Sequence, residues 1–396
     1  MASDYALRYG LSDAEEAWRL RAEAFARDEV APLSREADRA GRFPRALVPR
    51  MAALGLLRAP VAKAHGGAGA GALANALVSE ELGRVDGSVR GFLAVHVGLV
   101  TQTVAELGTD EQRRAWLPRL MSGETIGCFA LTEPGAGSDA AAVATRAREE
   151  GDEVVLDGEK HWITNGGVAG LAIVFATADP AAGRKGVEAY LVPTSTPGFS
   201  ARPMEGHPLG HRASDHARIV LEGCRVPRAA RLGPARGGFR VAMAGLDHGR
   251  LGVAAGAVGI QAACLEAATA FARTRRQFGQ RVGDFQQVGA SLAEMKVALE
   301  ASRLLVHHAA RTLDRTGGPA TAETSAAKLF ATEAALRTAT QAVRVHGARG
   351  YDDALPVERH YRDAVGLTIY EGTSEIQRVI LARDLLGRDD GGGSTR

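Results

Sequence analysis

The spacing of hydrophobic residues changes twice along the chain. From Leu11 to about Gly123, Ala, Leu, Glu and Arg dominate and Gly or Pro breaks are few, which predicts helices. Ser12 and Glu15 have the spacing of a capping box at the start of the first long helical run. This stretch therefore predicts an N-terminal helical domain.

Between about Ile126 and Pro234 the apolar runs become short and rich in Val and Ile, as strands are. Asp157-Gly158 and Asn165-Gly166 stand beside two of these runs and predict turns between strands. The region therefore predicts a β domain. The strands that we expect lie at 153–156, 172–175, 188–192 and 217–221.

From about Gly238 to Gly387 helical spacing returns in longer segments, and Leu292, Met295, Leu299 and Val306 follow one face of a helix. Long helices with short connections predict a bundle. The expected organisation is a helical domain over 1–125, a β domain over 126–235, a helical bundle over 236–388 and a disordered tail over 389–396.

Charge and cysteine content narrow the function classes. The 396 residues carry 48 Lys+Arg and 46 Asp+Glu, a net charge of +2, without a block of like charge, so no nucleic-acid partner is expected. Cys128, Cys224 and Cys264 lie far apart, which excludes a CxxC metal or disulfide pattern. The start of the chain lacks a signal peptide's apolar core, and charged residues interrupt the apolar run at 245–272. We expect a cytoplasmic enzyme with a small substrate, without a metal and without a membrane span.

Four motifs make the expectation specific: TEPGAGSD at 132–139, WITNG at 162–166, RRQFG at 275–279 and YEGTSEIQR at 370–378. In this order they resemble the acyl-CoA dehydrogenase family, and the resemblance extends from about Glu15 to Leu386. The stretch at 358–378 is most similar to the short- and branched-chain members. The resemblance implies a mostly α fold with a small central β-barrel and a C-terminal four-helix bundle. It also implies a homotetramer, one FAD per subunit, and an electron-transfer flavoprotein as acceptor.

The resemblance also assigns cofactor contacts. A flavin that lies against its substrate needs a flat wall, and the segments 129–132 and 162–164 resemble that wall. Taken alone, TEPG reads as a turn and Trp162 as a core residue, but the other motifs favour the cofactor interpretation. The implied contacts are Phe129, Ala130, Leu131, Thr132, Gly137, Ser138, Trp162, Ile163, Thr164, Arg275, Gln277, Phe278, Gln286, Arg344, Val345, Gly347, Ala348, Thr373 and Glu375.

The FAD pyrophosphate needs cationic donors. Arg275 matches the family arginine that reaches it, and Gln286 matches a second contact; in the family both come from the neighbouring subunit. Alone, Arg275 would read as a solvated helix end. The segment 344–351 departs from close relatives, which have Gln where Arg344 stands and Gly where Ala348 stands. A guanidinium suits a pyrophosphate, and Ala348 adds a methyl near the cofactor.

The chemistry of α,β-dehydrogenation needs a base on one face of the substrate and a hydride acceptor on the other. By resemblance Glu371 is the base, its backbone N–H donates to the thioester carbonyl, and the flavin takes the hydride. A carboxylate shielded from water should have a raised pKa. Some family members carry the base at the position of Gly249, which has no proton acceptor here. The implied substrate contacts are Ser138, Asp247, Arg250 and Gly372.

Arg90 leaves the acyl group open. The segment 85–90 resembles the one that, in glutaryl-CoA dehydrogenases, places an arginine against a distal carboxylate. The neighbouring acid of those enzymes falls at Gly83 here. The alternative is a salt bridge to a local acid or a solvent-exposed side chain.

The sequence therefore predicts an FAD-dependent dehydrogenase of a short- or branched-chain acyl-CoA, with a dicarboxylic or an acyl-carrier-protein-bound acyl group as alternatives. A basic patch of Arg202, His207, His211 and Arg212 would favour the carrier protein. A flavin-free binding protein would have lost Glu371, Trp162 and Arg275. Transfer of electrons to oxygen, the acyl length and the identity of the acceptor stay open.

Overall fold

The computed structural model describes residues 3–387. The N-terminal region is helical, and the Ser12–Glu15 capping box is present at the start of its second helix. Its α-helices are α1 (Asp4–Tyr9), α2 (Asp13–Phe25), α3 (Ala31–Ala40), α4 (Leu47–Ala53), α5 (Gly71–Val85), α6 (Gly87–Leu93), α7 (Gln102–Leu107) and α8 (Asp110–Met121). Shorter or wider helical turns are η1 (Ala26–Val30), η2 (Leu56–Arg58), η3 (Lys63–His65) and η4 (Ala94–Thr101).

The middle of the chain forms one curled sheet of seven strands, in the order β1-β4-β2-β3-β7-β6, with β5 on the other edge of β4. All four strands expected from the sequence are present. The bounds are β1 (Gly127–Ala130), β2 (Arg146–Glu150), β3 (Glu153–Thr164), β4 (Leu171–Thr177), β5 (Val187–Pro193), β6 (Phe199–Pro203) and β7 (His216–Pro227). The helical turns η5 (Ala140–Ala142) and η6 (Pro180–Gly186) lie between strands, and η7 (Arg228–Ala230) follows β7.

The turn expected at Asp157-Gly158 was wrong. These residues lie inside β3, where the register against β7 shifts between Leu156 and Gly158. A Cβ at Gly158 would lie 2.5 Å from the Thr145 hydroxyl oxygen, so the glycine serves close packing at a bulge.

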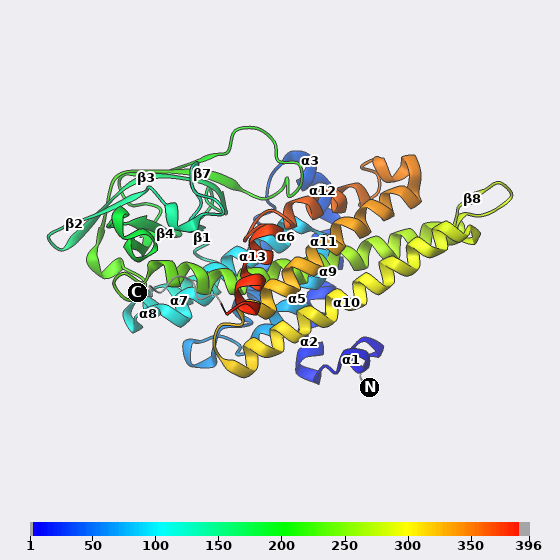
Figure 1. Cartoon of the computed structure of the whole chain (residues 1–396), viewed down its shortest axis with the longest axis horizontal. Coiled ribbons are helices and arrows are strands. Elements are labelled where there is room, and N and C mark those ends of the chain that lie inside the picture. The colour runs from blue at the N-terminus through cyan, green and yellow to red at the C-terminus, as the bar shows by residue number, and fades with distance from the viewer. Residues whose placement is uncertain (1–2, 388–396) are drawn as a thin grey trace.

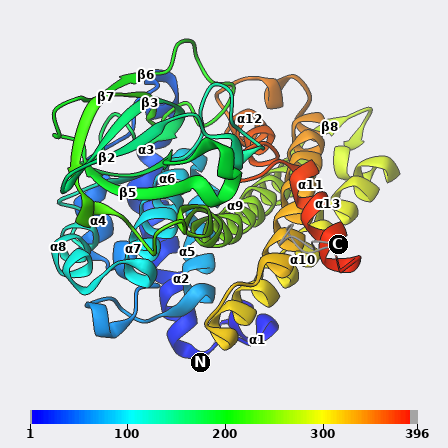
Figure 2. The ribbon, with the colours of Figure 1, turned by 60° about the vertical axis from the view of Figure 1, so that its left-hand side comes forward.

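The C-terminal region is a bundle built around one long helix. α9 (Gly238–Thr274) packs against α5, α10 and α11 and forms the middle of the largest apolar cluster. By length and composition α9 is apolar enough to span a membrane. However, 78% of its apolar 18-residue stretch is buried inside the protein. Figure 2 shows α9 between the β domain and the rest of the bundle.

The expected order of helical domain, β domain and helical bundle is confirmed. The remaining elements are β8 (Arg276–Gln277), β9 (Gln280–Arg281), η8 (Val282–Asp284), α10 (Gln286–Thr316), α11 (Thr321–His346), η9 (Gly347–Tyr351), α12 (Val357–Leu367) and α13 (Ser374–Leu385). The expected tail at 389–396 lies outside the described residues.

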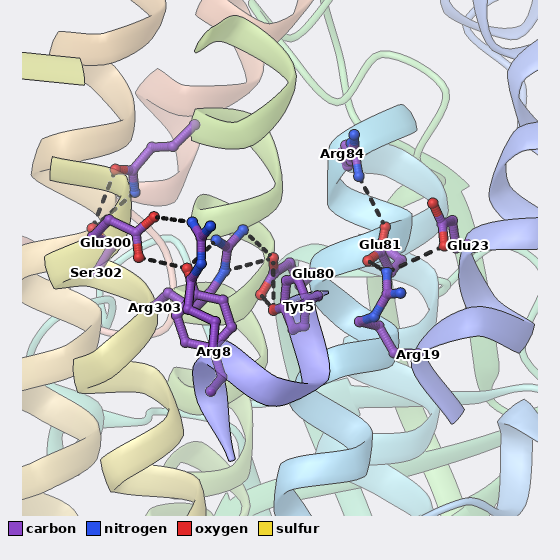
Figure 3. Close-up of polar contacts among 12 residues, drawn as sticks. Tyr5, Arg8, Arg19, Glu23, Glu80, Glu81, Arg84, Glu300, Ser302 and Arg303 are labelled. Carbon is purple, nitrogen blue, oxygen red and sulfur yellow. Dashed lines mark hydrogen bonds and ion pairs between the residues drawn. The ribbon is translucent and has the colours of Figure 1, made fainter. Parts of the chain in front are cut away.

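A buried polar network fastens the first two helices to the bundle (Figure 3). Arg303 of α10 pairs with Glu80 of α5 at 2.6 Å, and Arg19 of α2 pairs with Glu81 at 2.8 Å. The Tyr5 ring of α1 lies between the two guanidinium groups, 4.6 Å from Arg19 and 4.9 Å from Arg303. Because these groups have little access to water, each depends on its partners for hydrogen bonds. The network therefore connects α1 and α2 to α5 and α10, two helices that pack against α9.

Candidate functional site

Glu371 lies in the short connection between α12 and α13, in an unusual backbone conformation. Its φ is +53°, and that of Gly372 is +87°. A side chain in the left-handed region costs ~1–3 kcal/mol and persists only where the surroundings hold it. Gln377 of α13 donates to the carbonyl oxygens of Glu371 (3.3 Å) and Gly372 (2.9 Å). The connection is therefore a fixed turn that aims the carboxylate.

The Glu371 carboxylate points at the bare backbone of α9. A Cβ at Gly249 would lie 1.9 Å from Oε2 of Glu371 and 2.8 Å from Leu99 Cδ2. Oε2 is buried and makes no hydrogen bond within residues 3–387. Gly249 and Glu371 thus share one space, so a side chain at 249 would displace the carboxylate. The two base positions expected from the sequence are therefore mutually exclusive in this fold.

Burial raises the pKa of Glu371 to about 7, although three cations act in the opposite sense. They are Arg90 of α6, Lys328 of α11 and Arg250 of α9. A carboxyl group with this pKa is partly ionised near neutral pH and can accept a proton there. Because Oε2 has no hydrogen bond to break within residues 3–387, this carboxylate can act as a general base.

Arg90 is neither exposed nor paired with a local acid, so both parts of the alternative interpretation were wrong. Its side chain is 2% exposed, and Nη2 donates to the Tyr370 hydroxyl at 2.6 Å. That hydroxyl lies 3.0 Å from Nε2 of His211. Arg90 forms no ion pair within residues 3–387. A Cβ at Gly256 would come within 2.7 Å of Arg90 Nε, so α9 leaves room for the guanidinium only because it carries glycine there.

Two of the expected substrate residues lie on α9 beside Gly249. Arg250 donates to Asp247 at 2.6 Å, and Asp247 also accepts from the Thr321 hydroxyl at 2.8 Å. Both charged groups are buried. The pair is therefore neutral as a unit and shapes the surroundings of Glu371 without adding net charge.

Lys328 was missed by sequence reasoning. It is fully buried on α11, and its ammonium donates to the Gly372 carbonyl oxygen at 2.7 Å. A detectable signal existed, because Lys328 occupies a position on the face formed by Thr324, Ala327, Ala331 and Ala335, all of which are buried. A lysine at a core position of a helix indicates a partner that the local sequence does not contain.

The two segments expected to form the flavin wall lie side by side. The His161 N–H donates to the Thr132 carbonyl at 2.9 Å, which joins β3 to the loop after β1. Trp162 is 56% exposed, with φ +59°, where the β3 register shifts between Lys160 and Ile163. Phe129 packs on α9 at Gly245, where a Cβ would lie 3.1 Å from its ring. Gly245 lies one helical turn from Gly249, so α9 connects this wall to Glu371.

The loop between the two segments is held by a buried ion pair. Lys160 Nζ lies 2.6 Å from Glu133, which also accepts from the Thr145 hydroxyl. Lys160 donates to the Leu131 carbonyl as well. Gly137 and Ser138 are exposed beyond this anchor. The anchor therefore fixes 131–133, next to the exposed Gly137 and Ser138.

The expected pyrophosphate contacts lie at the opposite end of the bundle from the β domain (Figure 1). Arg275, Gln277 and Phe278 belong to the β8–β9 hairpin or its entry, and Gln286 begins α10. Phe278 is 93% exposed. A single chain therefore does not bring these residues to Trp162 or Glu371.

Arg344 lies at the same end of the bundle. The Phe271 ring of α9 and the His346 ring of α11 are 4.5 Å apart, so the ends of the two helices meet. The side chains of Arg275 and Arg344 are exposed and form no ion pair or hydrogen bond within residues 3–387. Gly347 and Ala348 are exposed beside them, and Val345 is half-buried. Thr373 caps α13, and Glu375 lies exposed in its first turn.

The basic patch expected at 202–212 was wrong in one member. His211 is buried, and its backbone N–H donates to the Asp363 carboxylate at 2.5 Å. Burial lowers the His211 pKa to about 3, so the ring is neutral. Arg202, His207 and Arg212 are exposed. Three of the four residues expected in the patch are therefore at the surface.

The comparisons with known proteins support the family resemblance over nearly the whole chain. The family models "Acyl-CoA dehydrogenase, N-terminal domain", "middle domain" and "C-terminal domain" match residues 12–124, 128–224 and 236–386. The mitochondrial short-chain specific acyl-CoA dehydrogenase of Homo sapiens is 44% identical over 362 residues, 91% of this chain and 87% of that protein.

Three solved structures share the fold. Butyryl-CoA dehydrogenase from Megasphaera elsdenii has a TM-score of 0.92 at 36% identity and covers 95% of this chain and 99% of its own. Glutaryl-CoA dehydrogenase from Mycobacterium smegmatis has a TM-score of 0.91 at 35% identity, covering 99% and 98%. The prolyl acyl carrier protein oxidase AnaB has a TM-score of 0.88 at 31% identity, covering 94% and 99%.

Proposed function

The chain belongs to the acyl-CoA dehydrogenase family of flavin-dependent oxidoreductases acting on CH–CH bonds, and we propose that it dehydrogenates a short- or branched-chain acyl-CoA with Glu371 as base. One observation carries this proposal. Oε2 of the Glu371 carboxylate is buried and has no hydrogen-bond partner within residues 3–387, and this burial raises the pKa of Glu371 to about 7. Such a group can accept the α-proton of a thioester near neutral pH.

The surroundings of Glu371 suit the negative charge that develops on the thioester oxygen as the proton leaves. Asp247 is paired with Arg250, whereas Arg90 and Lys328 form no ion pair within residues 3–387. The Glu371 backbone N–H makes no hydrogen bond in the same residues and is available to the thioester carbonyl. The α-proton goes to Glu371, and the β-hydrogen leaves with its electron pair, which gives the 2-enoyl thioester. Bound FAD supplies the hydride acceptor.

The residues present fit FAD. Trp162 offers an exposed aromatic face beside Thr132, where a flavin ring needs a wall. Arg275 and Arg344 offer guanidinium groups that are unpaired within residues 3–387, and guanidinium groups suit a pyrophosphate. The β domain carries the flavin wall, and the two arginines lie at the opposite end of the bundle in the same subunit. FAD would therefore bind between subunits. We therefore propose a cytoplasmic homotetramer with one FAD per subunit and an electron-transfer flavoprotein as acceptor.

Arg275→Ala should weaken retention of FAD, because the pyrophosphate loses a cation whose side chain has no other partner within residues 3–387. Arg276→Ala is the matched control, since Arg276 is the adjacent exposed arginine. Flavin absorbance per subunit after gel filtration measures retention, and the mass of the eluted species measures the oligomer. Equal FAD content in the two variants would remove Arg275 from the cofactor site.

A panel of acyl thioesters tests the reaction itself. We expect the FAD-loaded protein to lose its yellow colour under anaerobic conditions with butyryl-CoA or a branched short-chain acyl-CoA. The same acyl group on an acyl carrier protein and a dicarboxylic acyl-CoA are the other arms. If the carrier-bound acyl group bleaches the flavin faster, the acyl carrier protein would replace CoA as the proposed carrier.

A second candidate substrate rests on Arg90. The guanidinium is buried, has Tyr370 as its hydrogen-bond partner and has no acid partner within residues 3–387. Buried charges are usually paired. An acyl group with a distal carboxylate would supply the missing partner, and glutaryl-CoA dehydrogenase is among the similar structures. This candidate keeps the same base and changes only the acyl group.

A further inference from the structure

Lys328 is a buried charge whose only hydrogen bond within residues 3–387 goes to a main-chain oxygen. Its side chain is fully buried on α11, and Nζ donates to the Gly372 carbonyl oxygen at 2.7 Å. Burial lowers the Lys328 pKa to about 8, while the nearby Glu371 acts to raise it. Burying an ammonium group costs free energy compared with leaving it in solvent, so we expect this lysine to have a role that requires its buried position.

The group that Lys328 binds belongs to the turn that carries Glu371. Glu371 and Gly372 have φ values of +53° and +87°, so two consecutive residues have a left-handed backbone conformation. Their carbonyl groups receive hydrogen bonds from two side chains, Lys328 of α11 and Gln377 of α13. The two donors therefore hold the turn from both sides, one with a charge and one without.

We propose that Lys328 is a positioning residue for Glu371: its ammonium fixes the turn at Gly372 and places a positive charge beside the carboxylate. This inference rests on the proposed function, in which Glu371 is the base. Without Lys328, the turn loses its only charged donor, and the carboxylate can rotate from its place over Gly249. Lys328 does not contact the substrate in this proposal, and its effect on the pH midpoint of the reaction arises through Glu371.

Other charged groups face the same two residues. Glu371 also faces Arg90 of α6, Arg250 of α9 and the Tyr370 hydroxyl. Lys328 also faces Arg250, Glu333 and Glu375. Arg250 is paired with Asp247, Glu333 accepts from the Ser374 hydroxyl at 2.6 Å, and Glu375 is 3.2 Å from Arg378. Lys328 and Arg90 are therefore the two cations near Glu371 that no carboxylate within 4 Å neutralises in residues 3–387.

Lys328→Met and Gln377→Met form a matched pair, because both replace a donor to the same carbonyl by an unbranched apolar chain. We expect Lys328→Met to slow flavin reduction by about tenfold and Gln377→Met by at least as much, because the first removes one hydrogen bond from the turn and the second removes two. Only Lys328→Met removes a charge. Loss of a nearby cation disfavours the ionised carboxylate, so the pH midpoint of flavin reduction should rise by roughly one unit in this variant and stay unchanged in Gln377→Met.

A second readout does not depend on turnover. The carboxyl C=O stretch of Glu371, isolated by subtracting the infrared spectrum of the Glu371→Gln protein, gives the titration midpoint directly. It should rise in Lys328→Met as the kinetic midpoint does. If the Met variant does not fold, Lys328→Gln keeps a donor and removes the charge, and the same rise is expected.

An unchanged infrared midpoint in the charge-removing variant, or an equal shift in Gln377→Met, would overturn the proposal. Failure of the proposed function is distinguishable, because wild-type flavin would then remain oxidised with every thioester while the infrared titration would still report on Lys328.

Discussion

Glu371→Gln should slow reduction of the bound flavin by roughly two to four powers of ten, the usual contribution of a general base. Glutamine keeps the shape of the side chain, and Gly249 still leaves room for it. The backbone N–H and the left-handed turn are unchanged, so substrate should still bind. The loss should therefore appear in the rate of bleaching at saturating substrate rather than in affinity.

The pH profile gives the same assignment independently. Because burial raises the pKa of Glu371 to about 7, wild-type flavin reduction should rise with pH through that value as the carboxylate ionises. Glu36→Gln, an exposed glutamate on α3, is the control and should leave rate and profile unchanged.

If the flavin of the Glu371→Gln variant is reduced at a near-normal rate, another residue must accept the α-proton. His248 is the nearest titratable neighbour of the alternative base position, but it lies 2.9 Å from Glu106. Burial lowers the pKa of His248, and the contact with Glu106 more than offsets this, so the pKa is raised. Because the His248 ring is already engaged by Glu106, whereas Oε2 of Glu371 has no hydrogen-bond partner within residues 3–387, Glu371 is the stronger assignment.

Arg90→Ala should lose far more activity on a thioester with a distal carboxylate than on butyryl-CoA, if the acyl tail reaches Arg90. A buried carboxylate left without its partner costs ~3–5 kcal/mol, which is roughly two to three powers of ten in rate or binding. An apolar tail loses no partner.

The ratio of the two activities is the readout for Arg90. Arg90 donates to Tyr370, the residue before Glu371, so some loss on both substrates is expected from the turn alone. Arg90→Lys keeps the charge and tests whether the guanidinium geometry is needed. Equal losses on the two thioesters would make Arg90 a structural residue and leave the short- or branched-chain substrate.

Local sequence predicted what local interactions determine. The capping box at Ser12, the four strands and the helical periodicity are all properties of a few neighbouring residues. The turn expected at Asp157-Gly158 was wrong because the same dipeptide can form a turn or a bulge, and only the approach of Thr145, directly before β2, decides between them.

Contacts between distant segments were not predictable in the same way. Lys328 is 44 residues from its carbonyl partner, and Arg90 is 280 residues from Tyr370. At these separations along the chain, a single sequence shows no pattern that indicates which two residues come into contact. Arg275 and Arg344 were expected near the cofactor from a family resemblance alone, and the single chain places them away from Trp162.

The central claim is that the protein removes a proton from Cα and a hydride from Cβ of an acyl thioester. The most direct measurement is anaerobic bleaching of the bound flavin by butyryl-CoA that carries deuterium at Cα, at Cβ or at neither. The account predicts bleaching with the unlabelled substrate, formation of the 2-enoyl thioester, and slower bleaching with each label. A flavin that stays oxidised with every thioester in the panel, or that bleaches at one rate with all three forms, would contradict it.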